Sequence, residues 1–443
     1  MAGLLPLLIA LTIIETAVHH GRADAMGAWT MARALAVIGS GLVGWLIVCE
    51  LGGRILSRQP SLSRRWLERW DILLNAASLI GFAGLCYGGG WATRADYYSI
   101  ALAPWLIALV IHWWCLTPVV RTASGVPWGR RALLWHQVRF SLLPFAVALP
   151  ILDLCTWIAR STPLEHWLFA TFGEVVNIAG GFVLAAVLVT LLPWLLVRMW
   201  GAQPLSDPGL HVELSGACAR AGVQVGAILR WPVRGGRVYN AMVLGVLPRL
   251  RYVLFTDDLL RDFSAEERVA VLGHELGHAR HNHLWLYLLF ALTTGLISLA
   301  VRAPLDAWLA TVPLAADLEA DIRAGIVALI LLAVQWRLLF GVLSRMCERQ
   351  ADLAGAELVG GGNLTAGSAI MCQALLSVAR LAGIDPRTPS WRHYSIAERV
   401  AWLERAAAQP ATAVAHHLQV AQVARILAAA AGILSALAWI NRP

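Results

Sequence analysis

Repeated apolar runs constrain the fold of this chain more than any other feature of its sequence. Each run is close to the length that an α-helix needs to cross a bilayer. The runs lie at roughly residues 3–18, 34–53, 72–90, 98–118, 139–159, 177–199, 284–301, 323–343 and 420–440. Hydrophobic residues make up 58% of the 443 positions and charged residues only 14%, whereas soluble domains carry about 25% charged residues. The sequence therefore predicts an α-helical integral membrane protein with about eight to nine spans.

The first run is the weakest of them. It begins without a basic segment, and no small-residue cleavage site precedes the HHGRADA at residues 19–25. We therefore expect a retained span rather than a removed signal peptide.

Arginine residues set the expected orientation in the membrane. They crowd two loops, 54–71 and 121–139, whereas the loop around Arg94 and Asp96 is poor in charge. Because basic loops stay on the cytoplasmic side, both arginine-rich loops are expected there. Alternation of the spans then gives a cytoplasmic side to 200–283 and 344–419 and an external side to the acidic loop with Asp306, Asp317, Glu319 and Asp321. The net charge of +8 thus indicates orientation in a cell membrane, of the bacterial inner-membrane type, and not nucleic-acid binding.

Residues 202–283 differ from the apolar runs on either side. Asp207 and Pro208 mark the start of a helix. Three strand-like stretches follow, separated by the turn signals RGG and LPR: VQVGAILRW, RVYNAMVLGV and LRYVLFT. Ser264 and Glu267 then form a capping box that begins another helix. We expect a small antiparallel sheet followed by a helix that starts in water.

The segment VLGHELGHARHNH at residues 271–283 carries the chemistry. On a helix His274 and His278 share one face, so both imidazoles can bind one metal ion. Glu275 stands beside them, where a carboxylate can take a proton from a metal-bound water. His281 and His283 are interpreted as bystanders at the membrane interface. The seven cysteines show no paired spacing, so neither a disulfide framework nor a Cys-type zinc site is expected.

A catalytic zinc ion needs a third protein ligand and one open position for water. One solution is a histidine six residues beyond the second, with a glycine between them. Here Leu284 occupies that position and His281 stands in place of the glycine. The alternative is a carboxylate from a later helix, and LSRMCERQADLAGAELVG supplies Glu348. Asp352, one turn further on, can accept a hydrogen bond from a zinc-bound imidazole.

Spans 284–301 and 323–343 are expected to form a transmembrane hairpin. It returns Glu348 to the membrane surface that His278 left. The expected parts of the chain are an N-terminal membrane domain of about six spans (1–200), a cytoplasmic catalytic segment with the sheet and the histidine helix (201–283), the hairpin (284–343), a second cytoplasmic catalytic segment (344–419) and a C-terminal span (420–443).

Four motifs resemble those of the zinc membrane endopeptidases that include the bacterial HtpX-type heat-shock proteases and the CAAX prenyl endopeptidases. They are HELGH, SRMCERQAD, YNAMVLG and WRHYSIAERVAWL. The resemblance covers roughly Pro208 to Leu403 and leaves out the first five or six spans. It implies an α+β zinc-metalloprotease domain of the gluzincin type inserted among the spans.

The resemblance also implies a role for individual residues. One Zn²⁺ per chain would be bound by His274, His278 and Glu348, with Glu275 as general base and Asp352 behind the ligands. His393 would lie beside the tetrahedral intermediate, and Arg399 would orient the carboxylates. Asn240, Ala241 and Gly245 would belong to a substrate-binding edge strand. An extended peptide would pair with that strand, and His393 would donate to the oxyanion. Tyr394 replaces the proline that usually follows this histidine.

Three functions are compatible with these features. The first is a zinc endopeptidase in the lipid bilayer that cleaves membrane or membrane-proximal proteins, either misfolded ones or a specific partner. The second is a sensor-transducer, although no external segment is long enough for a separate ligand-binding domain. The third is a scaffold or transporter with a relic zinc site, which the intact set of ligands and base disfavours.

Overall fold

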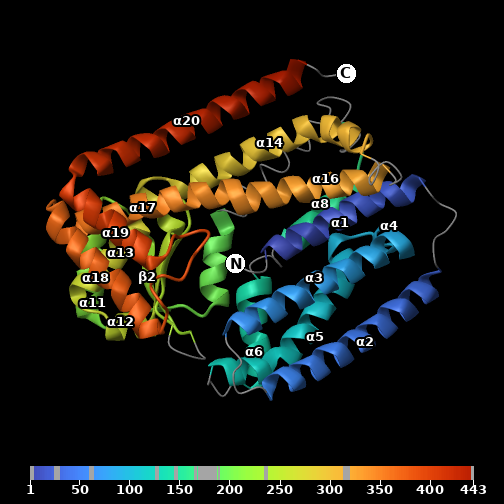
Figure 1. The fold of residues 1–443 in the computed structure, drawn as a ribbon, viewed down its shortest axis with the longest axis horizontal. Coiled ribbons are helices and arrows are strands. Elements are labelled where there is room, and N and C mark those ends of the chain that lie inside the picture. Colours follow the sequence, from blue (N-terminus) through green and yellow to red (C-terminus); the bar gives the residue numbers. More distant parts are fainter. Residues whose placement is uncertain are drawn as a thin grey trace. The chain divides into compact units, whose positions relative to one another are not determined.

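The computed structural model divides into two compact units (Figure 1). Unit 1 comprises Met1–Leu188 and Asp306–Leu329, and unit 2 comprises Val189–Leu305 and Ile330–Pro443. The structure describes residues 4–23, 30–58, 64–124, 129–143, 148–163, 190–233, 238–312 and 320–440, together with residues 167 and 187. Each unit has its own core of buried apolar side chains.

Unit 1 is a bundle of helices. They are α1 (Leu4–Ala23), α2 (Met31–Ser57), α3 (Arg64–Gly89), α4 (Trp91–Arg94), α5 (Tyr98–Ser124), α6 (Arg130–Gln137), the π-helical turn η1 (Val138–Leu142) and α8 (Ala148–Ser161). α2 packs along α5, and α3 contacts both α1 and α5. At Gly53 of α2, a Cβ would lie 2.7 Å from the backbone oxygen of Cys115 in α5. The absence of a side chain at Gly53 therefore lets the two helices approach closely.

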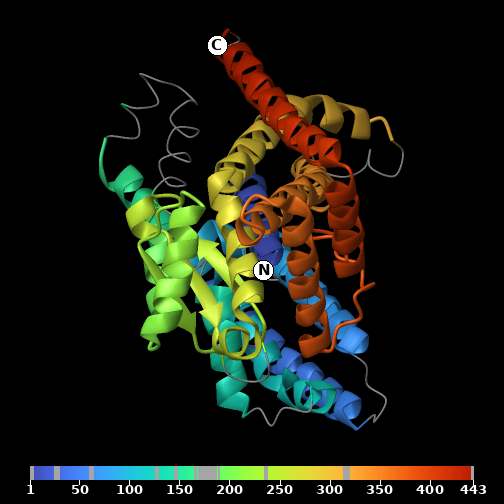
Figure 2. The ribbon, with the colours of Figure 1, turned by 90° about the vertical axis from the view of Figure 1, so that its left-hand side faces the viewer.

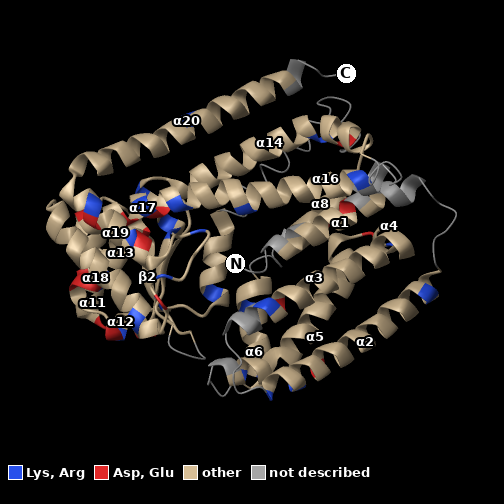
Figure 3. Ribbon diagram, viewed as in Figure 1, with Lys and Arg blue, Asp and Glu red and all other residues tan. Residues whose placement is uncertain are grey.

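Within the described residues, seven helices are long and apolar enough to cross a membrane. They are Met31–Ser57, Arg69–Gly89, Tyr98–Thr122, His283–Leu309, Arg323–Val359, Leu364–Ala382 and Pro410–Leu437. Figure 3 shows few charged residues along the middle of α2, α5 and the long helices of unit 2. All but Leu364–Ala382 correspond to spans predicted from the sequence, and α1 covers a further one. The prediction of a helical integral membrane protein is confirmed.

The structure describes the predicted span 139–159 in two parts, because residues 144–147 lie outside the described residues. The first part holds the π-helical turn at Val138–Leu142, and the second holds the apolar helix Leu149–Ile158. Pro150 lies in the first turn of α8, where its missing N–H is tolerated.

Two further predictions concern segments that the structure describes only in part. Of the predicted span 177–199, residues 190–199 are helical, and most of the remainder lies outside the described residues. Asp317 and Glu319 of the acidic loop also lie outside them. Asp306 of the same loop accepts a hydrogen bond from Arg323 at 3.1 Å.

Unit 2 holds the sheet and the histidine helix. Its elements are β1 (Gln203–Pro204), α11 (Pro208–Arg220), β2 (Ala227–Trp231), β3 (Ala241–Leu244), the 3-10 turn η2 (Pro248–Leu250), β4 (Tyr252–Thr256), α12 (Asp257–Asp262), α13 (Ala265–Arg280), most of α14 (His283–Leu309), the end of α16 (Ala320–Val334), the π-helical turn η3 (Gln335–Leu339), α17 (Phe340–Val359), α18 (Leu364–Ala382), α19 (Ile396–Ala408) and α20 (Pro410–Ile440). Figure 2 shows α20, in red, extending away from the strands of this unit to the C-terminus. α18 is apolar enough to qualify as a span, but it packs on α13, α17 and α19.

The sheet is mixed, and the prediction of an antiparallel sheet was wrong for one pair of strands. The order is β1-β2-β4-β3. β2 pairs with β4 in parallel, from Ala227↔Tyr252 to Trp231↔Thr256, whereas the β1–β2 and β3–β4 pairs are antiparallel. β3 runs opposite to β2 and forms a hairpin with β4, so β4 runs in the same direction as β2. The turn signals in the sequence give the reversals but not the order of the strands.

α13 and α17 pack closely through small residues. A Cβ on Gly277 of α13 would lie 2.8 Å from the Cβ of Ala354 and 3.0 Å from the Cα of Ala351. A Cβ on Gly273 would likewise lie 2.9 Å from the Cα of Gly355. A larger side chain at either glycine would separate the helices. This contact brings the histidine face of α13 against the carboxylates of α17.

Candidate metal centre

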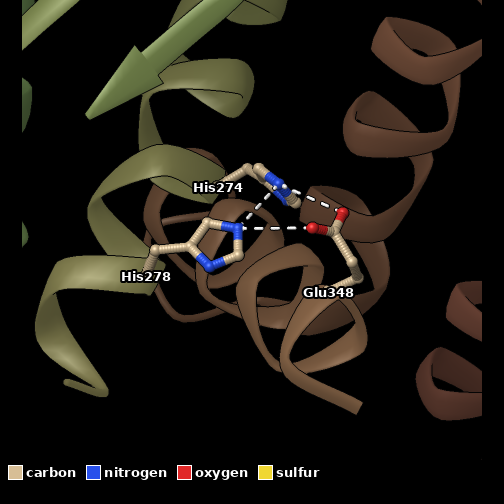
Figure 4. A group of neighbouring side chains, drawn as sticks. All are labelled: His274, His278 and Glu348. Atoms are coloured by element: carbon tan, nitrogen blue, oxygen red, sulfur yellow. Dashed lines mark hydrogen bonds and ion pairs between the residues drawn. The ribbon is translucent and has the colours of Figure 1, made fainter. Parts of the chain in front are cut away.

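Three donor groups from α13 and α17 converge on one point (Figure 4). His274 Nε2 and His278 Nε2 lie 3.3 Å apart. The Glu348 carboxylate oxygens lie 3.7 Å and 3.6 Å from these two nitrogens. The side chains of His274 and Glu348 are largely buried, at 11% and 6% exposure. These three residues form the only such cluster of His, Cys, Asp and Glu within the described part of the chain.

The donor set fits a zinc ion. Two nitrogens bound tetrahedrally to zinc at about 2.0–2.1 Å lie roughly 3.3–3.4 Å apart, close to the 3.3 Å between His274 Nε2 and His278 Nε2. Burial, followed by the neighbouring His274, lowers the pKa of His278 well below its usual value. A neutral imidazole offers a lone pair, and zinc coordinates neutral imidazole.

The second nitrogen of His274 is held by an acidic residue of α17. Nδ1 of His274 donates to Asp352 Oδ1 at 2.8 Å, and Asp352 is fully buried. Arg399 of α19 donates from Nε to Asp352 Oδ2 at 2.9 Å, and its Nη1 lies 3.6 Å from Glu348. The structure thus brings together His274, Asp352, Glu348 and Arg399 in the arrangement expected from the sequence.

Glu275 faces both the cluster and the edge of the sheet. The backbone N–H of Val243 in β3 donates to its Oε2 at 3.0 Å. Burial raises the pKa of Glu275 to about 7, although the nearby His274 acts in the opposite direction. A carboxylate with this pKa can exchange a proton near neutral pH.

His393 reaches the cluster from the segment before α19. Its Nδ1 lies 2.9 Å from Glu348 Oε1, and its side chain is 46% exposed. The next residue, Tyr394, has φ of 60°, a left-handed conformation that is costly for a bulky residue. The guanidinium of Arg349 lies 4.2 Å from the centre of the Tyr394 ring. This cation–π contact helps to hold the strained residue and so to place His393.

The predicted substrate strand is β3, at the open edge of the sheet. Asn240 precedes it and is tied to β4, because its backbone oxygen accepts from the Thr256 N–H at 3.0 Å. Ala241 is buried in the core of the unit. Gly245 follows the strand with φ of +94°, and a Cβ there would lie 2.2 Å from the Leu250 oxygen. Glycine is therefore required at this turn.

The interpretation of His283 as a bystander was wrong. Its ring is 1% exposed, and its Nδ1 lies 2.8 Å from Nδ1 of the metal-facing His278. Its Nε2 lies 2.9 Å from Oε1 of Gln350. The sequence signal for this contact was the position of His283, five residues after His278 and just beyond the turn that ends α13. His281 ends α13, with its ring 5.9 Å from that of His283.

The fold and this cluster define a helical membrane protein with a His-His-Glu cluster that could hold a metal ion. Residues 214–407 match the model of peptidase family M48. This segment is therefore similar to that family, which is the family that the motifs resembled.

Individual relatives agree with this assignment. The protease HtpX homologue of Pyrobaculum calidifontis is 30% identical over 185 residues, which are 41% of this chain and 52% of the relative. The protease HtpX homologue of Archaeoglobus fulgidus is 27% identical over 226 residues, 49% of this chain and 62% of the relative. This chain thus spans about half the length of the curated relatives that it matches.

A solved structure also resembles the whole fold. The crystal structure of S. mikatae Ste24p aligns with a TM-score of 0.55 and 15% identity, over 84% of this chain and 98% of that one. At this identity the likeness concerns the fold, which includes the helices outside the matched family segment.

Proposed function

We propose that the chain is a membrane-embedded zinc endopeptidase that hydrolyses peptide bonds of membrane or membrane-proximal proteins. The observation that carries the proposal is the convergence of His274 Nε2, His278 Nε2 and a Glu348 carboxylate beside Glu275. The match of residues 214–407 to the model of peptidase family M48 supports it.

His274, His278 and Glu348 would hold the ion. When bound, zinc would supply a Lewis acid and a water of lowered pKa. Glu275 accepts a proton from the attacking water on its carboxylate and passes it to the nitrogen of the departing amine. In the same reaction, the water oxygen bonds to the carbonyl carbon and the C–N bond of the peptide breaks.

Asp352 and Arg399 act on the ligands rather than on the substrate. Asp352 fixes the ring of His274 through its Nδ1, and Arg399 balances the charge of Asp352 and Glu348. His393 stands at the exposed side of the cluster, where a peptide carbonyl can approach. We assign it the donation of a hydrogen bond to the oxyanion.

The outer edge of β3 is suited to an extended peptide. In the antiparallel pair with β4, backbone groups alternate between the partner strand and the open side. Asn240 bonds to Thr256 of β4 and Val243 N–H points to Glu275, so Ala241 and Val243 present their backbone groups outward. A peptide carbonyl that accepts from Val243 N–H takes the place of Glu275 there. The Oε2 of Glu275 is then left to accept the proton of the water.

Cleavage and zinc binding can be separated by substitution. Glu275→Gln should keep one zinc ion per chain and lose cleavage of a casein-type substrate, because an amide cannot act as the base. His274→Ala and Glu348→Ala should lose both. Cleavage by Glu275→Gln at the native rate would refute the mechanism. The same variant is suited to trapping substrates in membranes for identification by mass spectrometry.

The site is proposed to face the cytoplasm, on the basis of the arginine-rich loops. A protease-accessible tag inserted at Asp317 should be cleaved from outside the cell, and one at Gly361 only from inside. The reverse pattern would overturn the orientation without affecting the assignment of the ligands.

A further inference from the structure

His283 lies just beyond the two-residue turn between α13 and α14. α13 ends at Arg280 and α14 begins at His283. Between them Asn282 adopts the left-handed conformation, with φ of 54°, which asparagine tolerates better than most residues. The His283 ring is buried and meets the ring of His278 edge-on, with their centres 4.9 Å apart. Figure 4 shows that the other nitrogen of His278, Nε2, faces Glu348.

A chain of polar contacts runs from His278 to α20. His278 Nδ1 lies 2.8 Å from His283 Nδ1, and His283 Nε2 lies 2.9 Å from Gln350 Oε1. Gln350 Nε2 lies 2.7 Å from Nδ1 of His417 in α20. Gln350 is 5% exposed, so both ends of its amide depend on these partners.

With the Gln350 amide oriented as in the structure, these contacts set which nitrogens carry hydrogen. The amide oxygen of Gln350 only accepts, so His283 Nε2 must donate to it. In a neutral His283 ring the Nδ1 is then an acceptor, and His278 Nδ1 must supply the hydrogen. His278 therefore carries its hydrogen on Nδ1 and presents a lone pair at Nε2. The opposite orientation of the Gln350 amide would place the hydrogen of His278 on Nε2, where it would block a metal ion.

We propose that His283, oriented by Gln350, is a positioning residue that holds His278 in the tautomer able to bind zinc. The proposal rests on the proposed function, because it presupposes zinc at the site. It gives each imidazole ligand its own support: Asp352 for His274, and the His283–Gln350 pair for His278. Because Gln350 also donates to His417, the C-terminal helix α20 takes part in the same network.

The first test is zinc affinity of the purified full chain in detergent, measured by competition with a chromogenic chelator. His283→Phe keeps a ring of similar size but removes both hydrogen bonds. Loss of such a support typically weakens metal binding about 10–100-fold, and we expect a loss in this range. His281→Phe is the matched control, because this ring contacts the same cluster from outside the chain of hydrogen bonds. It should bind zinc as tightly as the native chain.

Substitutions at Gln350 give a second readout that loss of packing would not produce. Gln350→Glu retains an acceptor for His283 Nε2 and should bind zinc with an affinity close to or above that of the native chain. Gln350→Leu removes this acceptor and should bind zinc more weakly than the native chain. Gln350→Leu in a His283→Phe background should add little further loss, because both residues act through one chain of contacts. The visible spectrum of the cobalt(II)-loaded chain should change in His283→Phe and remain native in Gln350→Glu.

The outcomes distinguish the two proposals. A native chain that binds no zinc refutes the proposed function. A native chain that binds one zinc ion, with His283→Phe equally tight, refutes the positioning role alone. If His283→Phe does not fold, the comparison of Gln350→Glu with Gln350→Leu decides, and equal losses in the two would overturn the proposal.

Discussion

Replacing Gly277 by alanine tests whether the contact between α13 and α17 sets the geometry of the site. The new Cβ would lie 2.8 Å from the Cβ of Ala354 and 3.0 Å from the Cα of Ala351. Ordinary carbon–carbon contacts are about 3.5–4.0 Å, so the helices must separate by several tenths of an ångström. Overpacking of this kind costs about 1–3 kcal/mol. Alanine in a helix interior returns about 1 kcal/mol relative to glycine, which leaves a net loss of up to about 2 kcal/mol.

The matched control is Gly216→Ala in α11. A Cβ there would lie 3.7 Å from Arg220 Nη1, an ordinary contact, so the helix preference of alanine should stabilise the chain by up to about 1 kcal/mol. Thermal unfolding in detergent with excess chelator measures both without the contribution of bound metal. One kcal/mol shifts the midpoint by roughly 2–4 °C in a domain of 150–250 residues. If Gly277→Ala melts above the native chain, as the control should, the close contact does not limit the approach of the helices.

Three further predictions test other parts of the chain. Asp352→Asn should weaken zinc affinity about 10–100-fold by chelator competition, since the support of an imidazole ligand loses its charge; native affinity would contradict this. Val243→Pro should fold, because the N–H it removes points to the open edge, but should lose casein cleavage, whereas Met242→Pro should disrupt pairing with β4; full activity of the first would contradict the proposed edge. Glu267→Gln should lower stability near neutral pH by about 1–2 kcal/mol, because Glu267 accepts from Ser377 at 2.6 Å.

The pH dependence of that last effect follows from the pKa of Glu267. Burial raises this pKa, but hydrogen bonds from Ser377 and Ser264 outweigh burial, so it lies below the usual 4.5. The carboxylate therefore contributes its full stability above pH 4.5 and loses it as the pH falls through the lower folded pKa. The difference in unfolding free energy between the native chain and Glu267→Gln should shrink over that acidic range. A difference that grows on acidification would show that the carboxylate is not stabilised in the fold.

The sequence was sufficient for the features that depend on helix periodicity. His274 and His278 lie four residues apart, and Glu348 and Asp352 are spaced in the same way, so each pair was expected on one helix face. The long apolar runs between the pairs predicted the hairpin that returns one helix to the other. The capping box at Ser264 formed as expected, with Glu267 bonded back to the cap. These features are local, and they required no knowledge of how the elements pack.

Features set by the order of packing were not accessible in this way. Strand-like stretches and turn signals predicted β2, β3 and β4, and the resemblance implied that β3 lies at an edge. The parallel pairing of β2 with β4, however, depends on which strands meet in three dimensions. Likewise the glycines of α13 could be seen in HELGH, but their contact with Ala351 and Ala354 required the coordinates.

The support of His278 shows why such a contact escapes a reading based on helix faces. His283 lies beyond the end of α13, so its ring cannot be placed by the periodicity of that helix. Its position depends on a single left-handed residue, Asn282, and its hydrogen bonding depends on Gln350, which comes from another helix. From the sequence alone, His283 was interpreted as a bystander at the membrane interface. Only burial of the ring, which leaves its two nitrogens no water to bind, forces each of them onto a protein partner and so links the turn after α13 to the chemistry of the ligand.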